Sequence, residues 1–151
     1  MIYYLDTSAL VKLYVREQGT ERMLQLASNL NGDSFAVLAL SEVEVRSAIR
    51  RRERAGDIDS KAATFVLDRF HLHMKTRFLR QIVTDATLTH AAQIVDRYFL
   101  RAYDAVQLAA CLTLKSSFKG EPLTFVCSDQ ELLEAAKSER LTIWDPSAPS
   151  P

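Results

Sequence analysis

Four acidic residues of this 151-residue chain stand where the predicted secondary structure changes to helix: Asp6, Glu44, Asp104 and Asp129. Asp6 and Asp129 each follow a short apolar run that is typical of a buried strand. In an open parallel sheet the functional crevice lies beyond the carboxyl ends of the strands, so we expect the four side chains to meet on one rim. Carboxylates gathered at one crevice repel one another and raise each other's pKa unless a cation lies between them.

The residue types around these acids favour a hard metal ion. Oxygen ligands alone select Mg²⁺, or Mn²⁺, over softer transition metals. The histidines and cysteines offer no competing site: His71 and His73 point in different directions on a helix, His90 is isolated, and Cys111 and Cys127 lack the spacing of paired ligands. The sequence therefore predicts a divalent-ion site built from carboxylates.

Each acid also has a structural alternative as a helix cap, since Ser, Asp and Glu are common at helix starts. The matching patterns are Asp6-Thr7-Ser8, a capping box from Ser41 to Glu44, a similar spacing from Asp104 to Gln107, and Ser128 with Glu131, which leaves Asp129 in the first turn. A second ambiguity concerns Glu42 and Glu44. They point about 200° apart around a helix, so only one of them can face the rim.

Short apolar runs alternate with segments of helical periodicity along the chain. The runs that predict strands are Ile2–Leu5, Phe35–Leu38, Gln81–Val83, Leu123–Cys127 and Leu141–Trp144. The segments that predict helices are Ala9 to Tyr14, Thr20 to Leu30, Ser41 up to Gly56, Ile58 to about Met74, Leu88 to Phe99, Asp104 to Leu114 and Gln130 to Glu139. This alternation predicts an α/β fold with a central, mostly parallel sheet and helices on both faces.

The composition is that of one ordinary globular domain, with 48% apolar and 25% charged residues. The longest apolar run is far shorter than a membrane helix needs, and Asp6 ends the first apolar stretch too early for a signal peptide. We therefore expect a cytoplasmic protein in which Cys111 and Cys127 are buried free thiols. Residues 1–146 are expected to form the domain, and residues 147–151 a flexible tail.

The charges balance over the whole chain but not along it. Nineteen basic and nineteen acidic residues exclude a protein that coats nucleic acid by net charge alone. Between Arg46 and Arg80, however, ten Lys or Arg face four Asp or Glu, a local net charge of +6. Four arginines of this region are candidates for contacts to RNA phosphates: Arg46, Arg50, Arg51 and Arg52. The alternative is an ordinary solvated helix face.

The chain resembles the PIN-domain ribonucleases, in particular the VapC-type toxins of bacterial and archaeal toxin–antitoxin pairs. The resemblance spans nearly the whole sequence and rests on the order and spacing of four motifs. These are Tyr4-Leu5-Asp6-Thr7-Ser8-Ala9-Leu10, Glu44-Val45-Arg46-Ser47-Ala48, Tyr103-Asp104-Ala105-Val106-Gln107-Leu108-Ala109 and Phe125-Val126-Cys127-Ser128-Asp129, with Asp145-Pro146 after the last strand. Ser128 stands where the family usually has threonine, which keeps the hydroxyl.

The resemblance implies a Mg²⁺-dependent ribonuclease on a single PIN-like domain. Its acidic site would be Asp6, Glu44, Asp104 and Asp129, with Asp6, Asp104 and Asp129 as metal ligands and Ser8 or Ser128 as a supporting hydroxyl. The motif around Glu44 favours this residue over Glu42. A metal-activated water would attack the phosphodiester bond of RNA in line.

The resemblance also implies partners. A small cognate antitoxin would neutralise the toxin by laying its tail across the first two helices, where the candidate groove residues are Leu10, Leu13, Tyr14, Met23 and Leu24. A homodimer is expected on the same basis.

Three other classes of protein are alternatives to this interpretation. A haloacid-dehalogenase-like phosphatase needs a second acid two residues after the first, where this chain has Ser8. A receiver-like signalling domain needs an adjacent acid pair and a phosphoacceptor aspartate at the end of its middle strand, and neither is evident. The alternative left open is a non-catalytic RNA- or protein-binding module on the same fold, since fold does not fix function.

Overall fold

A computed structural model describes residues 1–149 and contains one five-stranded sheet with the order β3-β2-β1-β4-β5. The strands are β1 (Ile2–Leu5), β2 (Ser34–Leu38), β3 (Leu79–Gln81), β4 (Leu123–Val126) and β5 (Thr142–Trp144). All neighbouring pairs are parallel, so the predicted α/β class is confirmed. The third strand forms two residues earlier than its apolar pattern suggested. Its residues pair with Ala36–Leu38, while the apolar Ile82 and Val83 lie beyond the strand and are exposed.

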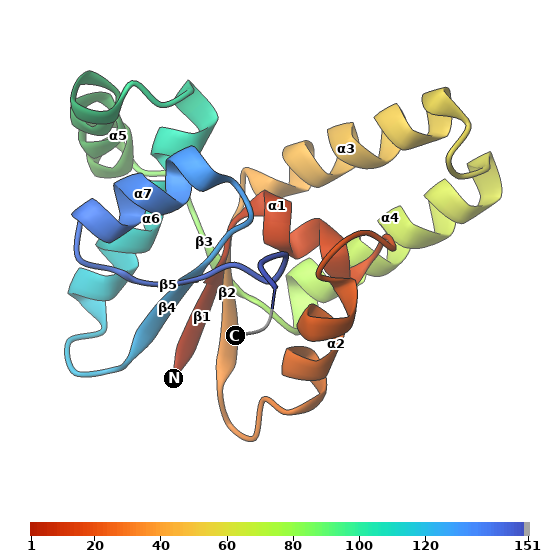
Figure 1. Ribbon diagram of the computed structural model, residues 1–151, viewed down its shortest axis with the longest axis horizontal. Coiled ribbons are helices and arrows are strands. Elements are labelled where there is room, and N and C mark those ends of the chain that lie inside the picture. Colours follow the sequence, from red (N-terminus) through yellow and green to blue (C-terminus); the bar gives the residue numbers. More distant parts are fainter. Residues whose placement is uncertain (150–151) are drawn as a thin grey trace.

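Helices cover both faces of the sheet (Figure 1). Their bounds are α1 (Thr7–Leu10), the 3₁₀ turn η1 (Val11–Leu13), α2 (Thr20–Ser28), α3 (Ser41–Ala55), α4 (Ser60–Thr76), α5 (Asp85–Tyr98), α6 (Ala102–Ser117) and α7 (Gln130–Ser138). The first four α-helices lie on one side and the last three on the other. The predicted first helix is therefore a short α-helix that tightens into a 3₁₀ turn.

The two faces of the sheet build two hydrophobic clusters because side chains alternate along each strand. Tyr4 and Phe125 point to the side of α5, α6 and α7, where their rings stack at 5.9 Å. Leu5 and Val126, the next residues on the same strands, pack on the side of α1 to α4. Both predicted free cysteines are buried and unpaired in the described part of the chain.

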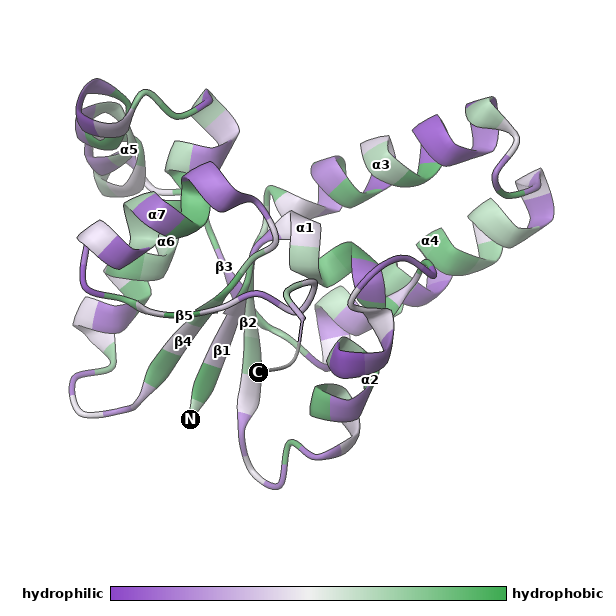
Figure 2. Cartoon of the chain, in the orientation of Figure 1, coloured by the Kyte–Doolittle hydropathy of each residue, from purple (hydrophilic) through white to green (hydrophobic). Residues whose placement is uncertain are grey.

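Helices α3 and α4 form an antiparallel hairpin that projects from the sheet (Figure 1). Val45 and Ile49 of α3 share a cluster with Ala63 and Leu67 of α4. Hydrophilic and hydrophobic residues alternate along both helices (Figure 2). Gly56 ends α3 with a φ of +82°, and its N–H bonds the carbonyl oxygens of Arg52 and Glu53. The start of the hairpin therefore lies beside the carboxyl edge of the sheet, because α3 begins directly after β2.

The segment after β5 folds back onto the loop before α2. Gln18 donates a hydrogen bond to the Ser147 carbonyl oxygen at 2.7 Å, and Arg22 bonds the carbonyl oxygens of Asp145 and Pro146, each at 3.3 Å. Ser147 and Ala148 of the predicted tail are thus in contact with the domain. Residues 150–151 lie outside the described residues, and the tail's flexibility stays a prediction. Within residues 1–149, no helix is long and apolar enough to cross a bilayer.

Candidate active site

The four predicted acids line a single cavity of about 530 Å³ at the carboxyl edge of the sheet. Asp6 follows β1, Asp129 follows β4, Glu44 lies in the first turn of α3 after β2, and Asp104 lies in the first turn of α6. The parallel register of β1 with β2 and β4 therefore brings residues more than a hundred positions apart to one rim.

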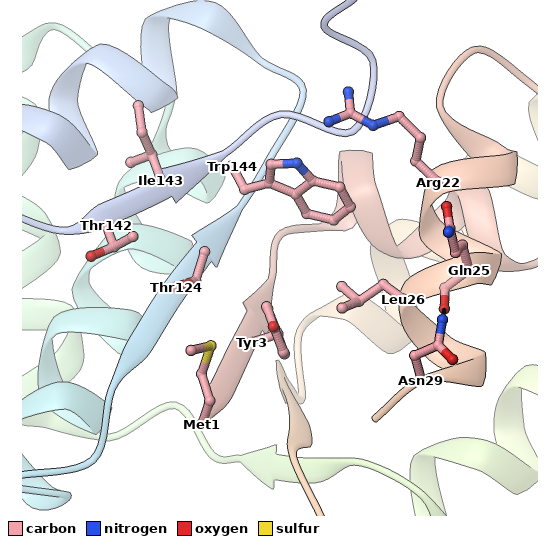
Figure 3. Close-up of a pocket in the computed structure, with 10 residues that line it drawn as sticks. All are labelled: Met1, Tyr3, Arg22, Gln25, Leu26, Asn29, Thr124, Thr142, Ile143 and Trp144. Atoms are coloured by element: carbon pink, nitrogen blue, oxygen red, sulfur yellow. Dashed lines mark hydrogen bonds between the residues drawn. The ribbon is translucent and has the colours of Figure 1, made fainter. Parts of the chain in front are cut away.

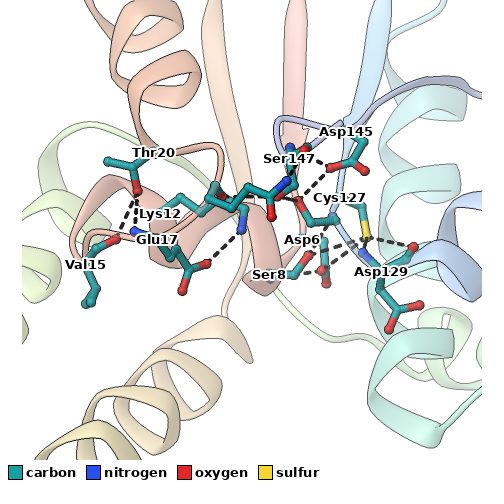
Figure 4. A network of polar contacts seen from close by, with 12 residues as sticks. Asp6, Ser8, Lys12, Val15, Glu17, Thr20, Cys127, Asp129, Asp145 and Ser147 are labelled. Carbon is teal, nitrogen blue, oxygen red and sulfur yellow. Dashed lines mark hydrogen bonds and ion pairs between the residues drawn. The ribbon is translucent and has the colours of Figure 1, made fainter. Parts of the chain in front are cut away.

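Asp6 lies at the floor of this cavity and is 4% exposed. It is the N-cap of α1, where its Oδ2 accepts the N–H of Ser8 at 3.0 Å. The Sγ of Cys127 lies 3.5 Å from the same oxygen (Figure 4). Burial raises the pKa of Asp6, and the hydrogen bonds from Ser8 oppose that rise only in part. The cap and an acidic site are therefore compatible at this residue.

Glu44 is held by hydrogen bonds from two side chains, both to Oε2. The Thr7 hydroxyl donates at 2.6 Å and the Gln107 amide at 2.7 Å. The Tyr4 hydroxyl in turn donates to Gln107 Oε1 at 3.1 Å, which fixes the orientation of the amide. Burial raises the pKa of Glu44, and the bonds from Thr7 and Gln107 oppose this rise. The carboxylate is thus positioned from beneath by a chain of buried polar groups.

The predicted capping box at Glu44 does not form. The N-cap of α3 is Leu40, and Ser41, already inside the helix, accepts a bond from Gln107 at 3.1 Å. The carboxylate is bound to side chains rather than to the start of its own helix. Glu42 points elsewhere and pairs with Arg80 at 2.9 Å. Glu44 rather than Glu42 therefore lines the cavity.

Asp104 is not the predicted cap of its helix either. The N-cap of α6 is Arg101, and Gln107, the expected partner in a cap, is fully buried beneath Glu44. Burial, followed by the charges of Asp6 and Asp129, raises the pKa of Asp104 to about 6, although Arg101 acts in the opposite direction. Asp104 therefore experiences the other two aspartates as close negative charges.

Asp129, and not Ser128, is the N-cap of α7. Its Oδ1 accepts the N–H of Leu132 at 2.9 Å, while the Ser128 hydroxyl turns to Asp145 at 2.9 Å. The predicted cap by Ser128 is wrong because Asp145 and Ser147, which follow β5, take up this hydroxyl. Ser8 accepts the Ser128 N–H at 2.9 Å and so ties α1 to the end of β4. Of the two candidate hydroxyls, only that of Ser8 lies beside Asp6.

The four candidate arginines have different surroundings. Arg50 pairs with Glu53 at 2.7 Å, and Arg52 pairs with Glu17, which also holds the buried Lys12 at 2.8 Å. Arg46 is exposed on α3. Arg51 and Arg52 line the acidic cavity, and so does Arg101, whose position in the sequence gave no sign of this role.

The predicted antitoxin groove needs a correction. Leu10 and Met23 are fully buried in the core, because they are the residues that fix α1 and α2 to the sheet, and so they cannot line a surface groove. Leu13 and Tyr14 are half-buried, and Leu24 is 42% exposed. The hollow in this region lies on the other side of α2, where Leu26 and Arg22 face Tyr3 and Trp144 of the sheet (Figure 3).

The acidic cavity suits a divalent cation by its chemistry and location. Three aspartates and a glutamate supply only oxygen, and the raised pKa of Asp104 comes in part from neighbouring negative charges that a cation would neutralise. Within residues 1–149, no three acidic, histidine or cysteine side chains already stand in an arrangement that could hold a metal ion. The carboxylates would therefore have to come closer together to bind one.

Two polar residues of the site were missed as functional residues in the sequence. Thr7 was assigned to a helix cap and Gln107 to the cap at Asp104, yet both donate to Glu44. Gln107 did carry a usable clue, because it is the one amide in an otherwise apolar stretch of α6. A buried amide needs hydrogen-bond partners, and those partners lie at a site where polar groups converge.

The fold and the acidic cavity together define a PIN domain, and the PIN-domain family model matches residues 3–138. The chain therefore belongs to the PIN-domain family. Within that family it is similar to ribonuclease VapC35 of Mycobacterium tuberculosis (strain CDC 1551 / Oshkosh), with 31% identity over 144 residues, 95% of this chain and 96% of that protein. The resemblance found in the sequence is thereby confirmed.

Two solved structures share the fold. A chain in the structure of FitAB bound to an IR36 DNA fragment superimposes with a TM-score of 0.70 at 18% identity, covering 100% of this chain and 99% of that chain. A chain in a toxin–antitoxin complex from Klebsiella pneumoniae superimposes with a TM-score of 0.65 at 13% identity, covering 95% and 97%. At these identities the likeness concerns the fold alone.

Proposed function

We propose that this protein is a Mg²⁺-dependent endoribonuclease of the VapC type, and that it acts as the toxin of a toxin–antitoxin pair. The observation that carries the proposal is the convergence of Asp6, Glu44, Asp104 and Asp129 on one cavity. Its support is the family membership and the name of the relative, a ribonuclease. Mn²⁺ is expected to substitute for Mg²⁺, because it accepts the same oxygen ligands.

In the proposed mechanism, Asp6, Asp104 and Asp129 would hold the cation at the carboxyl edge of the sheet. Its chemistry, when it is bound, would be a more acidic water and positive charge beside the phosphate. Glu44, which is anchored from beneath through Oε2, orients the attacking water or accepts its proton through the remaining oxygen. Arg51 and Arg101, on the wall of the cavity, attract the negatively charged backbone of the RNA.

Cleavage of a structured RNA tests the ribonuclease directly. The wild type should cut the RNA with Mg²⁺ and not with EDTA, and Asp6→Asn, Asp104→Asn and Asp129→Asn should each lose at least about a hundredfold in rate, as expected when a group that binds the reacting atoms is removed. Asn preserves the caps at Asp6 and Asp129. RNA that is bound but left intact with Mg²⁺ would instead indicate the non-catalytic binding module.

The contribution of the arginines can be separated by their pairing. Arg51→Ala should weaken RNA binding and flatten its dependence on salt, because a lost phosphate contact releases fewer counterions. Arg50→Ala is the matched control on the same helix, since Arg50 is engaged by Glu53. If RNA binding by the wild type and by Arg51→Ala depends equally on salt, Arg51 makes no phosphate contact and is part of an ordinary solvated helix face.

An antitoxin is the proposed protein partner, and its tail is expected along α2. The support is that the structure from Klebsiella pneumoniae is of a toxin–antitoxin complex. Leu24→Glu, at an exposed position of α2, should abolish neutralisation by the product of the neighbouring short gene, whereas Leu88→Glu on α5, across the sheet, should not. Neutralisation that survives Leu24→Glu would place the antitoxin elsewhere.

A homodimer and a cytoplasmic location belong to the same proposal and rest on the family alone. Light scattering at micromolar concentration should give twice the chain mass of 17.1 kDa, and a monomeric mass would contradict the dimer.

A further inference from the structure

The acidic cavity continues into a second hollow of about 330 Å³. Six residues line both spaces: Thr7, Glu44, Ala48, Arg51, Arg101 and Asp104. The second hollow adds Leu40 and Val43 at the start of α3 and Tyr103 in the first turn of α6. A group held in it would therefore lie directly beside the carboxylates.

Tyr103 lies at the edge of this second hollow with most of its side chain exposed. It is 61% exposed, and in the part of the chain that the structure describes its hydroxyl has no hydrogen-bond partner. Among the described residues, the Tyr103 ring has no aromatic partner and belongs to neither hydrophobic cluster, although the neighbouring Asp104 lines the acidic cavity. A large aromatic ring left open at the rim of a cavity suits contact with a flat ligand.

The other walls of the hollow fit the same kind of ligand. Leu40 and Val43 give it an apolar side, and Val43 is 66% exposed. Arg51 and Arg101 give it two guanidinium groups that form no ion pair within residues 1–149. Hollows of this size commonly hold a small planar group between apolar walls and a few polar contacts. An aromatic base flanked by phosphates has this combination of a flat apolar face and negative charge.

We propose that this hollow is a nucleobase subsite in which Tyr103 stacks on the base next to the phosphate that is cut. The proposal rests on the ribonuclease function above and adds how the chain holds its substrate. Arg51 and Arg101 contact the phosphates on the two sides of that base. Stacking of a base on an aromatic side chain tolerates every base, so the subsite positions the strand and requires that the base be unpaired there.

Binding of two single-stranded RNAs in metal-free buffer tests this subsite without cleavage. One probe is a fluorescein-labelled 12-nucleotide oligoadenylate, and the other has the same backbone with stable abasic residues throughout. The wild type should prefer the base-bearing probe, and Tyr103→Ala should reduce that preference by about 5- to 150-fold, the range given by the loss of one stacking contact. Tyr103→Phe, which keeps the ring, should retain the preference.

Phe118→Ala is the matched control, because Phe118 is also an exposed aromatic residue and lies at the far end of α6, about 22 Å away along the helix axis. It should bind both probes as the wild type does. An unchanged preference in Tyr103→Ala, or an equal loss on both probes, would overturn the subsite. If the preference for the base-bearing probe depends on Tyr103 but the protein with Mg²⁺ does not cleave RNA, the subsite stands and the ribonuclease proposal fails. If the protein cleaves RNA but the preference does not depend on Tyr103, the ribonuclease proposal stands and the subsite fails.

Discussion

At the scale of single residues, the site is built from acids whose charge the fold makes costly. Burial raises the pKa of Asp6, Glu44 and Asp104, and neighbouring carboxylates raise it further at Glu44 and Asp104. Side-chain donors favour the ionised forms of two of these acids: Thr7 and Gln107 donate to Glu44, and Ser8 and Cys127 donate to Asp6. Such opposed influences are typical of functional sites, where chemistry rather than stability determines the residues.

Replacement of Gln107 by leucine should loosen Glu44 and destabilise the fold. The variant leaves the Tyr4 hydroxyl and the Glu44 carboxylate without their partner in a buried space, so the free energy of unfolding should fall by about 1–3 kcal/mol. Cleavage should fall as well at temperatures where the variant is folded. Urea unfolding measures the change in the free energy of unfolding. Tyr4→Phe removes only the hydroxyl that bonds Gln107, so its free energy of unfolding should fall by about 1 kcal/mol. A Gln107→Leu protein as stable and active as the wild type would show that the amide does not position Glu44.

The raised pKa of Asp104 predicts the pH dependence of stability in metal-free buffer. Between its ordinary value of 3.8 and about 6, the unfolded chain has lost the proton of Asp104 while the folded protein keeps it. The unfolded state therefore binds fewer protons in this window, and stability should decrease as pH rises through it. Thermal melting with EDTA from pH 4 to pH 6.5 checks this. Asp104→Asn should show a smaller decrease, and identical pH profiles would contradict the crowding of Asp104.

The residue scale also shows where prediction from the sequence ended. The positions of Asp6, Glu44, Asp104 and Asp129 after strands and at helix starts were enough to expect them on one rim. The caps at Glu44 and Asp104 were wrong because Leu40 and Arg101, which carry no capping side chain, begin those helices. Glu44 accepts hydrogen bonds from Thr7 of α1 and Gln107 of α6, which lie 37 and 63 positions away in the sequence. No local pattern reports contacts between residues so far apart.

At the scale of elements, the strands and helices followed from hydrophobic periodicity, while the connections did not. The return of the segment after β5 to the loop before α2 depends on Gly19, which has a φ of +90°. A Cβ added there would lie 2.8 Å from the carbonyl carbon and oxygen of Pro146. In the sequence, Gly19 gave no sign of a partner so far along the chain.

Gly19→Ala should therefore displace residues 145–148 from α2. A left-handed backbone conformation destabilises a residue with a Cβ by about 1 kcal/mol or more. The close contact with Pro146 destabilises the variant further, because the contacting atoms belong to the backbone and cannot move aside as a flexible side chain can. Gly56→Ala is the control, since Gly56 has a φ of +82° and open space around it. Thermal melting should show a larger loss for Gly19→Ala than for Gly56→Ala. Equal losses would mean that the contact with Pro146 has no energetic weight.

At the scale of the whole molecule, the parallel sheet explains why one edge carries the chemistry. Its strand order places β1 between β2 and β4, so the carboxyl ends of these three strands and the start of α6 surround one cavity. The hairpin of α3 and α4 then extends the cavity with Arg51 and the hollow next to Tyr103.

The sequence predicted the sheet and the acids well because both follow local patterns. The exposed and buried sides of α1 and α2 were predicted less well, because tertiary packing decides them.

The central claim is that Asp6, Asp104 and Asp129 act as one cation site, and Mg²⁺-dependent melting of the metal-free protein tests it most directly. Mg²⁺ that binds the folded cavity and not the unfolded chain should raise the melting temperature of the wild type by mass action. At a Mg²⁺ concentration of 100 times the dissociation constant, the free energy of unfolding should increase by about 2.7 kcal/mol. Asp6→Asn, Asp104→Asn and Asp129→Asn should melt at or above the wild-type temperature without Mg²⁺, because each relieves repulsion, and should respond far less to the ion. An identical Mg²⁺ response in all four proteins would contradict the shared site.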